Sequence, residues 1–335
     1  MLQLRVEAIK WELQDTATFY LSEISGKKIH YKAGQFITLV FDHHHEEIRR
    51  SYSLSSSPDE EFLSITIKRI PNGEISRFML TKIKPGDILH AEKPAGRFTL
   101  SDSSTGKTIF LFAAGSGIVP IFSQLKYTLN RDGESRFLLI YSNRDGNSIL
   151  FDAALHELAG RSAGRLTIIN LLSGDADRLT NYKVEQLVKQ YAENPADSEF
   201  YLCGPFDYMR MIRLTLLYMG IEPQQIRKEN FVLDTIAIPA SPVNFPPKTV
   251  RIHFGNETYD LVTGENQSIL QAALQNGIKL PYSCRQGICS ACTAVCKSGK
   301  VVMTKNDVLT DADLAAGLVL TCTGHAVGDG VVIEV

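Results

Sequence analysis

The sequence predicts three successive folded units: an antiparallel β-barrel or sandwich over residues 1–102, an α/β domain with a parallel sheet over 103–235, and a third unit over 248–335. Three observations support this division. A chain of 335 residues is too long for one ordinary compact domain. The rhythm of apolar residues changes near residue 107, and residues 236–247 carry four prolines and no charge, as expected of a semi-rigid linker.

The first unit contains short strand-like runs, such as QFITLVF and FLSITIKR, that are separated by the turn clusters PNGE and KPGD. Helical periodicity is weak here, and this pattern is typical of an antiparallel sheet. In the second unit, apolar runs alternate with amphipathic ones. The expected strands are TIFLFAA, FLLIYS, LTIINLL and EFYLCG, and the helices that follow them are expected at 118–130, 148–160, 183–192 and 205–218. Such alternation predicts a parallel sheet with crossover helices.

The third unit opens with a hairpin-like pair, VRIHF and YDLVT, followed by an expected helix at 267–276 and a cysteine-rich loop. Five of the six cysteines lie between Cys284 and Cys322, and only Cys203 lies elsewhere. A secreted disulfide framework distributes its cysteines over a short chain that carries an export signal. A local metal site is therefore the better interpretation.

Charge and hydropathy limit the possible partners and locations. The net charge of −2 gives no reason to expect nucleic acid or an anionic membrane as partner. No apolar run approaches the roughly 18–20 residues of a membrane span, and the start MLQLRVEAIKWELQ lacks the apolar core of a signal peptide. We expect a soluble cytoplasmic protein.

The cysteine loop PYSCRQGICSACTAVC has the strongest functional pattern in the chain. Its C-x4-C-x2-C spacing, with one further cysteine about thirty residues on, is the plant-type [2Fe–2S] ligand spacing. The predicted ligands are Cys284, Cys289, Cys292 and Cys322. Structural zinc is the alternative, but zinc sites usually pair two short knuckles, and a second knuckle is missing. Gly287 relieves crowding in the loop, and Cys296 is interpreted as a buried small hydrophobe rather than a ligand.

Residues 248–335 resemble plant-type ferredoxins of the β-grasp fold, an α+β fold, through the L-P-Y-S-C lead-in and the late L-T-C. The resemblance implies a one-electron carrier of low potential, on the order of −400 mV for the plant type.

A second set of motifs lies in the first unit. RSYSLSSSP is followed by GEIS and then by KPAGRF. The residues of interest are Arg50, Ser51, Tyr52, Ser53, Gly73, Ser76, Pro94, Gly96 and Phe98. In this order they resemble the flavin domain of the ferredoxin–NADP reductase family.

That resemblance implies that Arg50 meets the flavin pyrophosphate, that Tyr52 packs on the isoalloxazine ring, and that Ser53 hydrogen-bonds the N5 edge. Ser51 belongs to the same motif, and Ser76 with the amides of the GEIS turn would hold the pyrophosphate. A guanidinium fork and amide donors suit a diphosphate, and an aromatic partner suits a flat ring. FAD is favoured over FMN. The histidine run 43–45 lies in a charged loop and is not interpreted as a metal site.

TIFLFAAGSGIVP places Gly115, Gly117 and Pro120 after a strand and at the opening of a helix. This G-x-G-x-x-P pattern is related to the dinucleotide fingerprint, in which glycines permit a tight turn and close approach to a pyrophosphate. Pro120 fits an early helical position. In the ferredoxin–NADP reductase family that the chain resembles, residues at the position of the IYSNR segment help to select NADH or NADPH. The resemblance implies Ser142 and Arg144 as candidate contacts for a 2′-phosphate, so NADPH is slightly favoured over NADH.

YLCGPFDYM resembles the C-G-P motif that lies beside the nicotinamide in the same family, and it supplies Cys203, Gly204 and Pro205. The work expected of Cys203 is to pack against and position the nicotinamide near flavin N5. KENF ends the unit with Glu229 and Phe231, residues of the kind that approach the flavin in family members. Ser53, Cys203 and Glu229 are the candidates closest to the hydride-transfer step.

Together the motifs describe an electron relay. A hydride carries two electrons and a [2Fe–2S] cluster accepts one, so a flavin is needed between them. The order flavin, nucleotide, cluster resembles the reductase components of bacterial oxygenases, such as phenylacetyl-CoA epoxidase and Rieske hydroxylase systems. The resemblance implies a protein electron acceptor. A stand-alone ferredoxin or flavodoxin reductase, a diaphorase, and a non-catalytic carrier or binding module stay open.

Overall fold

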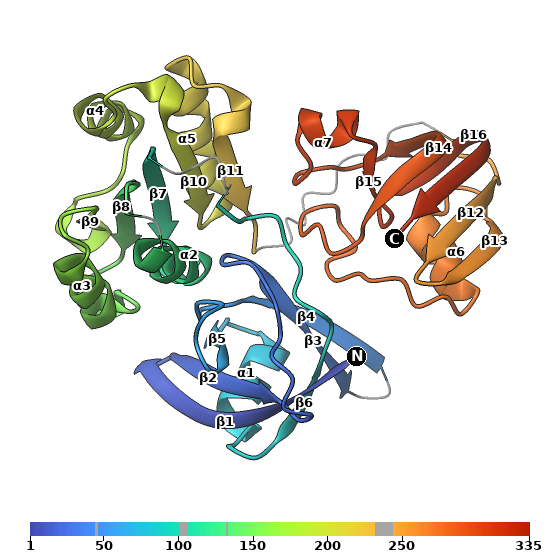
Figure 1. Cartoon of the computed structure of the whole chain (residues 1–335), viewed down its shortest axis with the longest axis horizontal. Coiled ribbons are helices and arrows are strands. Elements are labelled where there is room, and N and C mark those ends of the chain that lie inside the picture. The colour runs from blue at the N-terminus through green and yellow to red at the C-terminus, as the bar shows by residue number, and fades with distance from the viewer. Residues whose placement is uncertain (44–45, 101–105, 132, 232–243) are drawn as a thin grey trace. The chain divides into compact units, whose positions relative to one another are not determined.

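The computed structural model describes residues 1–43, 46–100, 106–131, 133–231 and 244–335. The chain divides into two compact units, Met1–Phe231 and Val232–Val335 (Figure 1). His44, His45 and residues 236–243 of the predicted linker lie outside the described residues.

Six antiparallel strands form the first sheet, as the sequence predicts, in the order β4-β3-β6-β1-β2-β5. A bridge between Leu54 and Ile65 joins the two edges, β4 and β5, and so closes the sheet into a barrel. The strands are β1 (Leu2–Leu13), β2 (Thr16–Glu23), β3 (Phe36–His43), β4 (Glu46–Ser53), β5 (Leu63–Lys68) and β6 (Ile88–Ala91).

The barrel also carries a helix that the sequence did not predict, α1 (Glu74–Lys82). It buries Ile75 and Met79 in the barrel core. Nine residues make only two and a half turns, which is too short a stretch for a clear helical period. The GEIS segment, interpreted from sequence as a turn, is therefore the start of this helix.

The second sheet is parallel and has the strand order β11-β10-β7-β8-β9. Its strands are β7 (Thr108–Ala114), β8 (Arg136–Asn143), β9 (Leu166–Leu172), β10 (Glu199–Cys203) and β11 (Ile226–Glu229), and its helices are α2 (Ile118–Arg131), α3 (Asp152–Arg161), α4 (Asn181–Tyr191) and α5 (Phe206–Tyr218). Four of these strands and all four helices agree with the sequence prediction. The fifth strand, β11, was not predicted from the sequence, because charged residues occupy its middle.

Helices cover both faces of the parallel sheet (Figure 1). Ile109, Leu111 and Tyr141 face the core that holds α2 and α3, whereas Phe110 and Phe200 face the core under α4 and α5. Burial on both faces explains why β7 reads as an unbroken apolar run. The chain order reverses between β7 and β10, and ligands of open α/β sheets bind at the carboxyl ends of strands at such a point.

The third sheet is mixed, with the strand order β13-β12-β16-β14-β15 and a parallel pairing of β12 with β16. Its elements are β12 (Thr249–Phe254), β13 (Glu257–Val262), α6 (Ile269–Gln275), β14 (Thr293–Met303), α7 (Asp311–Ala315), β15 (Leu318–Leu320) and β16 (Gly324–Glu334). A capping box between Ser268 and Gln271 starts α6. This helix packs its apolar face against the sheet, as in the expected β-grasp fold.

Phe245, which precedes β12, is fixed to this unit. Its ring stacks on His325 with centroids 4.2 Å apart and an interplanar angle of 11°. Its N–H donates to Asn266 Oδ1 at 2.9 Å, and Asn266 N–H donates to Phe245 O at 2.8 Å. Residues just before the first strand therefore pack as part of the unit.

Among the helices of the described ranges, none combines the length and apolar character needed to cross a lipid bilayer.

Candidate functional site

The RSYS motif forms the end of β4 and pairs with β3, with Tyr52 opposite Ile37 and Ser53 opposite Phe36. Ser51 shares a hydrogen bond with Thr38 at 2.9 Å between their hydroxyl oxygens. Arg50 is exposed, and its Nη1 donates to the carbonyl of Arg49 at 2.8 Å.

Tyr52 and Ser53 occupy the buried end of the motif. Burial raises the pKa of the Tyr52 phenol to about 12, although the positive charge of Arg50 lowers it somewhat. The Ser53 hydroxyl is enclosed, and it has no hydrogen-bond partner among the described residues. Leaving such a group unsatisfied costs about 1–3 kcal/mol, so a ligand atom at this position would stabilise the site. The strand end therefore fits the polar edge of a flavin ring.

In the GEIS segment, the Ser76 hydroxyl makes two hydrogen bonds to the backbone. The Ser76 hydroxyl donates to Gly73 O at 3.1 Å and accepts the Ile70 N–H at 3.2 Å, so it closes the turn before α1. A Cβ at Gly73 would lie 2.6 Å from Ser76 Oγ, which explains the glycine. α1 begins without a side-chain cap, and uncapped helical N–H groups suit an anion. The role of Ser76 toward pyrophosphate stays a prediction.

The KPAGRF segment packs beside β3. Gly96 has a φ of +116°, and a Cβ there would lie 2.9 Å from Phe36 Cδ1. Gln35 Nε2 donates to Gly96 O at 3.1 Å. Because Phe36 is opposite Ser53, this glycine lets the segment approach the strand end that carries the predicted flavin contacts.

The Gly115–Gly117 loop connects β7 to α2 as a single 3-10 turn. Gly115 has a φ of +54°, and its carbonyl accepts a hydrogen bond from Tyr141 Oη at 3.1 Å. A Cβ at Gly117 would overlap the carbonyl of Cys203. Pro120 is buried in the first turn of α2. The tight turn expected of a dinucleotide loop is present, and the close approach at Gly117 is to the backbone of Cys203.

The C-G-P motif lies directly against this loop. Cys203 pairs with Ala113 across the sheet, and a Cβ at Gly204 would lie 3.0 Å from Ala114 Cβ. Pro205 is the N-cap residue of α5. The structure thus brings together two motifs that are almost ninety positions apart in the printed sequence.

Cys203 and Glu229 are paired neighbours on β10 and β11. Burial raises the pKa of the Cys203 thiol well above its usual range, and the charge of Glu229 raises it further. The thiol therefore stays protonated, consistent with packing rather than nucleophilic chemistry. Burial also raises the pKa of the Glu229 carboxyl to about 8, so this carboxyl is able to hold a proton near neutral pH. Phe231 is partly exposed at the end of the unit.

Tyr208 was missed by the sequence reasoning. Its hydroxyl donates to Ala113 O at 3.1 Å and accepts from Ser142 Oγ at 3.5 Å, so Ser142 is oriented partly inward. Arg144 is exposed beyond β8, and its carbonyl accepts the Gly174 N–H at 2.8 Å. The only sequence signal for Tyr208 is an aromatic residue three positions after the C-G-P motif.

The four predicted cluster cysteines converge in the third unit. Side-chain hydrogen bonding links Cys284 with Cys289 and Cys322, and Cys292 with Cys322. This bonding lowers the pKa of Cys284 and raises that of Cys322. Backbone N–H groups point to sulfur, since Cys284 N–H donates to Cys289 Sγ at 3.4 Å and Gln286 N–H to Cys284 Sγ at 3.3 Å.

Three residues of the cluster loop, Arg285, Gly287 and Ser290, have positive φ angles of 57°, 72° and 55°. Such turns direct successive amides inward, toward the sulfur atoms. A Cβ at Gly287 would lie 2.6 Å from Lys305 O, so only glycine fits. Four converging thiols with amide donors around them suit a two-iron cluster.

In the described part of the chain, no set of three or more His, Cys, Asp and Glu side chains has the spacing of a single-ion site. Cys284 is linked with both Cys289 and Cys322, and Cys322 also with Cys292, so the four thiols form one connected group, as a four-cysteine cluster requires. Cys296 is half-buried on β14, where its thiol donates to Ser298 O at 3.3 Å, away from the ligand set.

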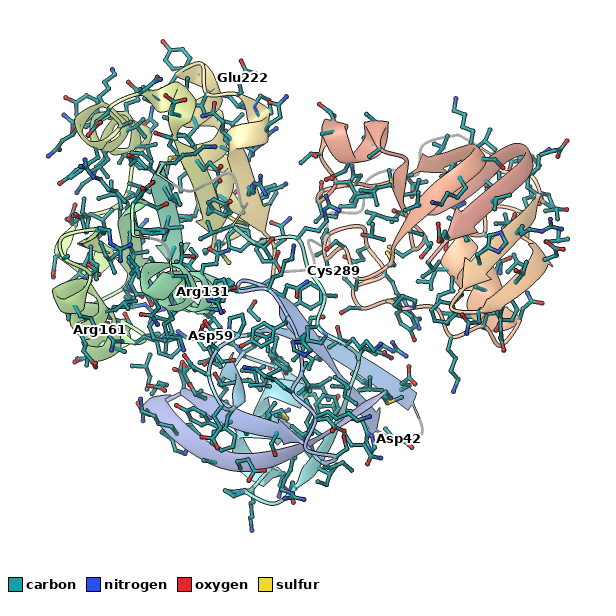
Figure 2. All side chains as sticks on the ribbon, in the orientation of Figure 1. Asp42, Asp59, Arg131, Arg161, Glu222 and Cys289 are labelled. Carbon is teal, nitrogen blue, oxygen red and sulfur yellow. The ribbon has the colours of Figure 1, made fainter. Side chains whose placement is uncertain are left out.

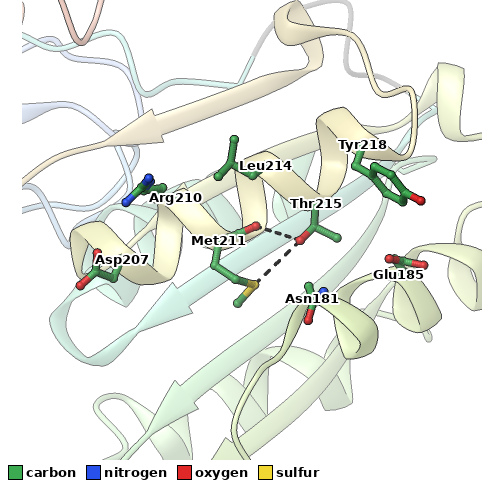
Figure 3. Close-up of a pocket in the computed structure, with 8 residues that line it drawn as sticks. All are labelled: Asn181, Glu185, Asp207, Arg210, Met211, Leu214, Thr215 and Tyr218. Carbon is green, nitrogen blue, oxygen red and sulfur yellow. Dashed lines mark hydrogen bonds between the residues drawn. The ribbon is translucent and has the colours of Figure 1, made fainter.

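A groove of about 690 Å³ lies between α4 and α5 (Figure 3). Within it Thr215 Oγ1 donates to Met211 O at 2.9 Å. None of the residues predicted for cofactor binding lines it; its walls are Asn181, Glu185, Asp207, Arg210, Met211, Leu214, Thr215 and Tyr218.

Family models match each part of the chain separately. Residues 3–100 match the oxidoreductase FAD-binding domain, residues 111–214 the oxidoreductase NAD-binding domain, and residues 254–327 the 2Fe-2S iron–sulfur cluster binding domain. The fold and the three groups of site residues thus define an NAD(P)H-dependent flavin and iron–sulfur oxidoreductase.

Two relatives match the chain over nearly the full length of both proteins. The chain is 33% identical to the ferredoxin reductase component of 3-ketosteroid-9-alpha-monooxygenase from Mycolicibacterium smegmatis, over 99% of this chain and 96% of the relative. It is 30% identical to a subunit of 1,2-phenylacetyl-CoA epoxidase from Escherichia coli K12, with coverage of 99% and 96%. The chain belongs to the ferredoxin reductase family of electron-transfer flavoproteins that carry a [2Fe–2S] domain.

Among solved structures, phthalate dioxygenase reductase has the same fold, with a TM-score of 0.63 and 22% identity. The match covers 100% of this chain and 98% of that protein. This likeness confirms the architecture of barrel, parallel sheet and β-grasp unit.

Proposed function

We propose that this chain is the reductase component of an oxygenase system, supplying electrons from NADPH to a separate oxygenase protein. The observation that carries the proposal is the full-length similarity to the reductase component of one such system and to a subunit of another, in a chain that contains FAD-, NAD- and 2Fe-2S-binding domains. When bound, the flavin and the cluster supply the conversion of a two-electron donor into single electrons.

In the flavin part of the site, the proposed roles follow the chemistry of the side chains. Ser53 donates to the flavin N5 edge, because its buried hydroxyl needs a partner. Tyr52 is half-buried and covers the ring with its aromatic face, and the exposed Arg50 reaches the diphosphate from the strand end. Gly73, Ser76 and the first N–H groups of α1 complete the diphosphate contact.

In the nicotinamide part, the backbone of the Gly115–Gly117 loop holds the dinucleotide pyrophosphate. Cys203 and Gly204 form the floor beside it, because Gly117 packs on their backbone. Glu229 lies next to Cys203 and holds or releases a proton near neutral pH. Pro205 and Phe231 complete the surface against which the nicotinamide lies.

NADPH is the preferred dinucleotide in this proposal. Arg144 follows β8 and supplies an exposed positive charge for a 2′-phosphate. Ser142, near the end of β8, is the second proposed contact, and its hydroxyl would exchange the long hydrogen bond to Tyr208 for one to the phosphate. Comparing kcat/KM for NADPH and NADH in the wild type and in Arg144→Gln tests this. Selective loss with NADPH supports the assignment, and equal change with both dinucleotides contradicts it.

We place the protein in the cytoplasm. The two cysteines outside the predicted cluster ligands, Cys203 and Cys296, form no disulfide, which suits a reducing compartment, and nicotinamide dinucleotides are available there.

The decisive experiment concerns the acceptor. The reduced protein is mixed with candidate oxygenase components, and reoxidation of the cluster is followed by stopped-flow absorbance. Fast reoxidation by an oxygenase, and slower transfer to cytochrome c, is the expected result. Equal rates with unrelated acceptors would favour a stand-alone reductase or diaphorase. A purified protein that holds zinc, or no flavin, would contradict the proposal as a whole.

A further inference from the structure

Helix α2 connects the dinucleotide loop to the flavin barrel through buried hydrogen bonds. The helix starts at Ile118, immediately after the Gly115–Gly117 loop. One turn further along, Ser123 Oγ donates to Ser56 O at 2.5 Å, and Gln124 Nε2 donates to Phe98 O at 2.6 Å. Both side chains are fully buried, although both are polar and lie on a helix of the parallel-sheet domain.

The two acceptors belong to the segments that carry the flavin motifs. Ser56 lies three residues after Ser53, and Phe98 ends the KPAGRF segment. One turn of α2 therefore holds both flavin segments, while the start of the same helix carries the dinucleotide loop. No residue of this contact was singled out from the sequence for it, because a Ser-Gln pair inside an amphipathic helix has no distinctive pattern.

The barrel is shaped to receive the Gln124 amide. Gly34 has a φ of +93°, and a Cβ at this position would overlap Phe98 O and lie 2.5 Å from Gln124 Nε2. A side chain at residue 34 would thus occupy the place of the hydrogen bond. The other amide atom, Gln124 Oε1, has no partner among the described residues, so the contact depends on the donor half alone.

Ion pairs lie along the same helix. Lys126 pairs with Glu60, and at the end of α2 Arg131 forms two hydrogen bonds with Asp59, at 2.9 and 2.8 Å (Figure 2). The Arg131 and Asp59 side chains are 58% and 46% exposed. An exposed pair such as Arg131–Asp59 is screened by water and contributes little to a fixed geometry, whereas the Lys126 side chain of the other pair is only 17% exposed. The buried neutral bonds, by contrast, leave unsatisfied carbonyls when they are broken.

We propose that Ser123 and Gln124 are positioning residues for hydride transfer: they fix the dinucleotide loop against the two flavin segments, and so set the distance between the nicotinamide and the flavin. The inference rests on the proposed hydride transfer from NAD(P)H to a flavin. Neither residue needs to touch a cofactor. A misplacement of about 1 Å between reacting groups is enough to slow a reaction on the order of a hundredfold.

This positioning role predicts that the variants reduce the flavin more slowly but bind the dinucleotide with nearly the same affinity. The dinucleotide loop is local to the parallel-sheet domain, so loss of either bond leaves dinucleotide binding nearly unchanged. The limiting rate of flavin reduction, which depends on the relative position of the two rings, decreases. The long-wavelength absorbance of stacked nicotinamide and flavin weakens for the same reason.

The test uses the full-length protein with flavin and cluster bound. Gln124→Met keeps the side-chain volume and removes the donor, whereas Gly34→Ala keeps the donor and fills its place. Arg131→Gln is the matched control, because it alters an exposed pair on the same helix. Anaerobic stopped-flow reduction by NADPH and NADH gives the limiting rate and the apparent Kd, and thermal melting with flavin and iron content confirms folding.

The expected result is a decrease of about tenfold or more in the limiting rate for Gln124→Met and Gly34→Ala, with apparent Kd within about twofold and little change for Arg131→Gln. Should Gln124→Met lose its flavin, Ser123→Ala makes the same comparison with a smaller change. Folded variants that are destabilised but reduced at the wild-type rate would overturn the inference. Slow reduction of the wild type itself would overturn the proposed function, and this inference with it.

Discussion

The unit Met1–Phe231 and the ferredoxin-like unit assemble their sites in opposite ways. In the first, the site residues come from segments far apart in the sequence, from Ser53 to Glu229, and long-range contacts bring them together. In the second, a single loop supplies three of the four predicted ligands, and local backbone turns with positive φ angles shape it. The difference matches the chemistry: hydride transfer requires contact between two rings, whereas single electrons pass over a gap.

The largest expected effect comes from removing a cysteine of the cluster loop in the ferredoxin-like unit. Cys289→Ser removes one predicted cluster ligand and should reduce electron delivery to a protein acceptor by about a hundredfold or more. Even a change to a residue that only supports a metal ligand costs about 10–100-fold. Flavin reduction by NAD(P)H should continue at nearly the wild-type rate, because no residue of that site lies in the loop. Anaerobic reduction and acceptor assays measure the two steps separately. Equal loss of both would refute the proposed order of transfer.

Ser53→Ala tests the site of the unit Met1–Phe231, whose residues come from segments far apart in the sequence. The variant removes a buried hydroxyl that lacks a partner among the described residues, so the apoprotein should be as stable as the wild type or slightly more stable. Hydride transfer should slow by about tenfold, because the flavin edge loses a donor. Thermal melting of apoprotein and stopped-flow reduction of holoprotein give the two quantities. A variant that is less stable but equally fast would assign Ser53 a purely structural role.

Glu229 makes the first unit sensitive to pH. Its carboxyl has a pKa of about 8 in the folded protein and an ordinary value of 4.5. Between these pH values the folded state keeps a proton that the unfolded state releases, so stability decreases as pH rises through this window. Glu229→Gln should remove this decrease in stability. The free energy of unfolding of the variant should exceed that of the wild type by a few kcal/mol at about pH 8. Urea unfolding at several pH values measures the free energy of unfolding of the wild type and of the variant. The same pH dependence in both proteins would contradict the raised pKa.

The smallest effect is expected where the ferredoxin-like unit meets the segment before it. Phe245→Ala removes the ring that stacks on His325 and should lower the free energy of unfolding of that unit by about 2 kcal/mol, less than a fully enclosed core ring. The rate of flavin reduction should not change. Unfolding monitored by cluster absorbance provides the measurement, with Arg251→Gln, at an exposed ion pair, as the control.

Local patterns were predictable from the sequence. The alternation of strands and helices located all four helices of the parallel-sheet domain, and the spacing of Cys284, Cys289 and Cys292 predicted a loop that brings the thiols together. In both cases the information lies within a few neighbouring residues. The same holds for the strained position of Gly287, where a turn and a close approach leave room only for hydrogen.

Contacts between distant segments were not predictable in the same way. β11 contributes Glu229 to the buried edge, but its charged middle hides the strand. The α1 helix was interpreted as a turn because it is short. Tyr208, Ser123 and Gln124 act through partners about 25 to 95 positions away, and nothing near them in the sequence indicates those partners.

The stacking of Phe245 on His325 has a practical consequence for exchanging modules between relatives. A ferredoxin-like unit excised at Lys248, where strand-like sequence begins, would leave behind the ring and the backbone bonds to Asn266, and would expose one face of the imidazole to water. A splice placed before Asn244 transfers these groups intact. Chimeras joined at the earlier position should fold more robustly than those joined three or four residues later.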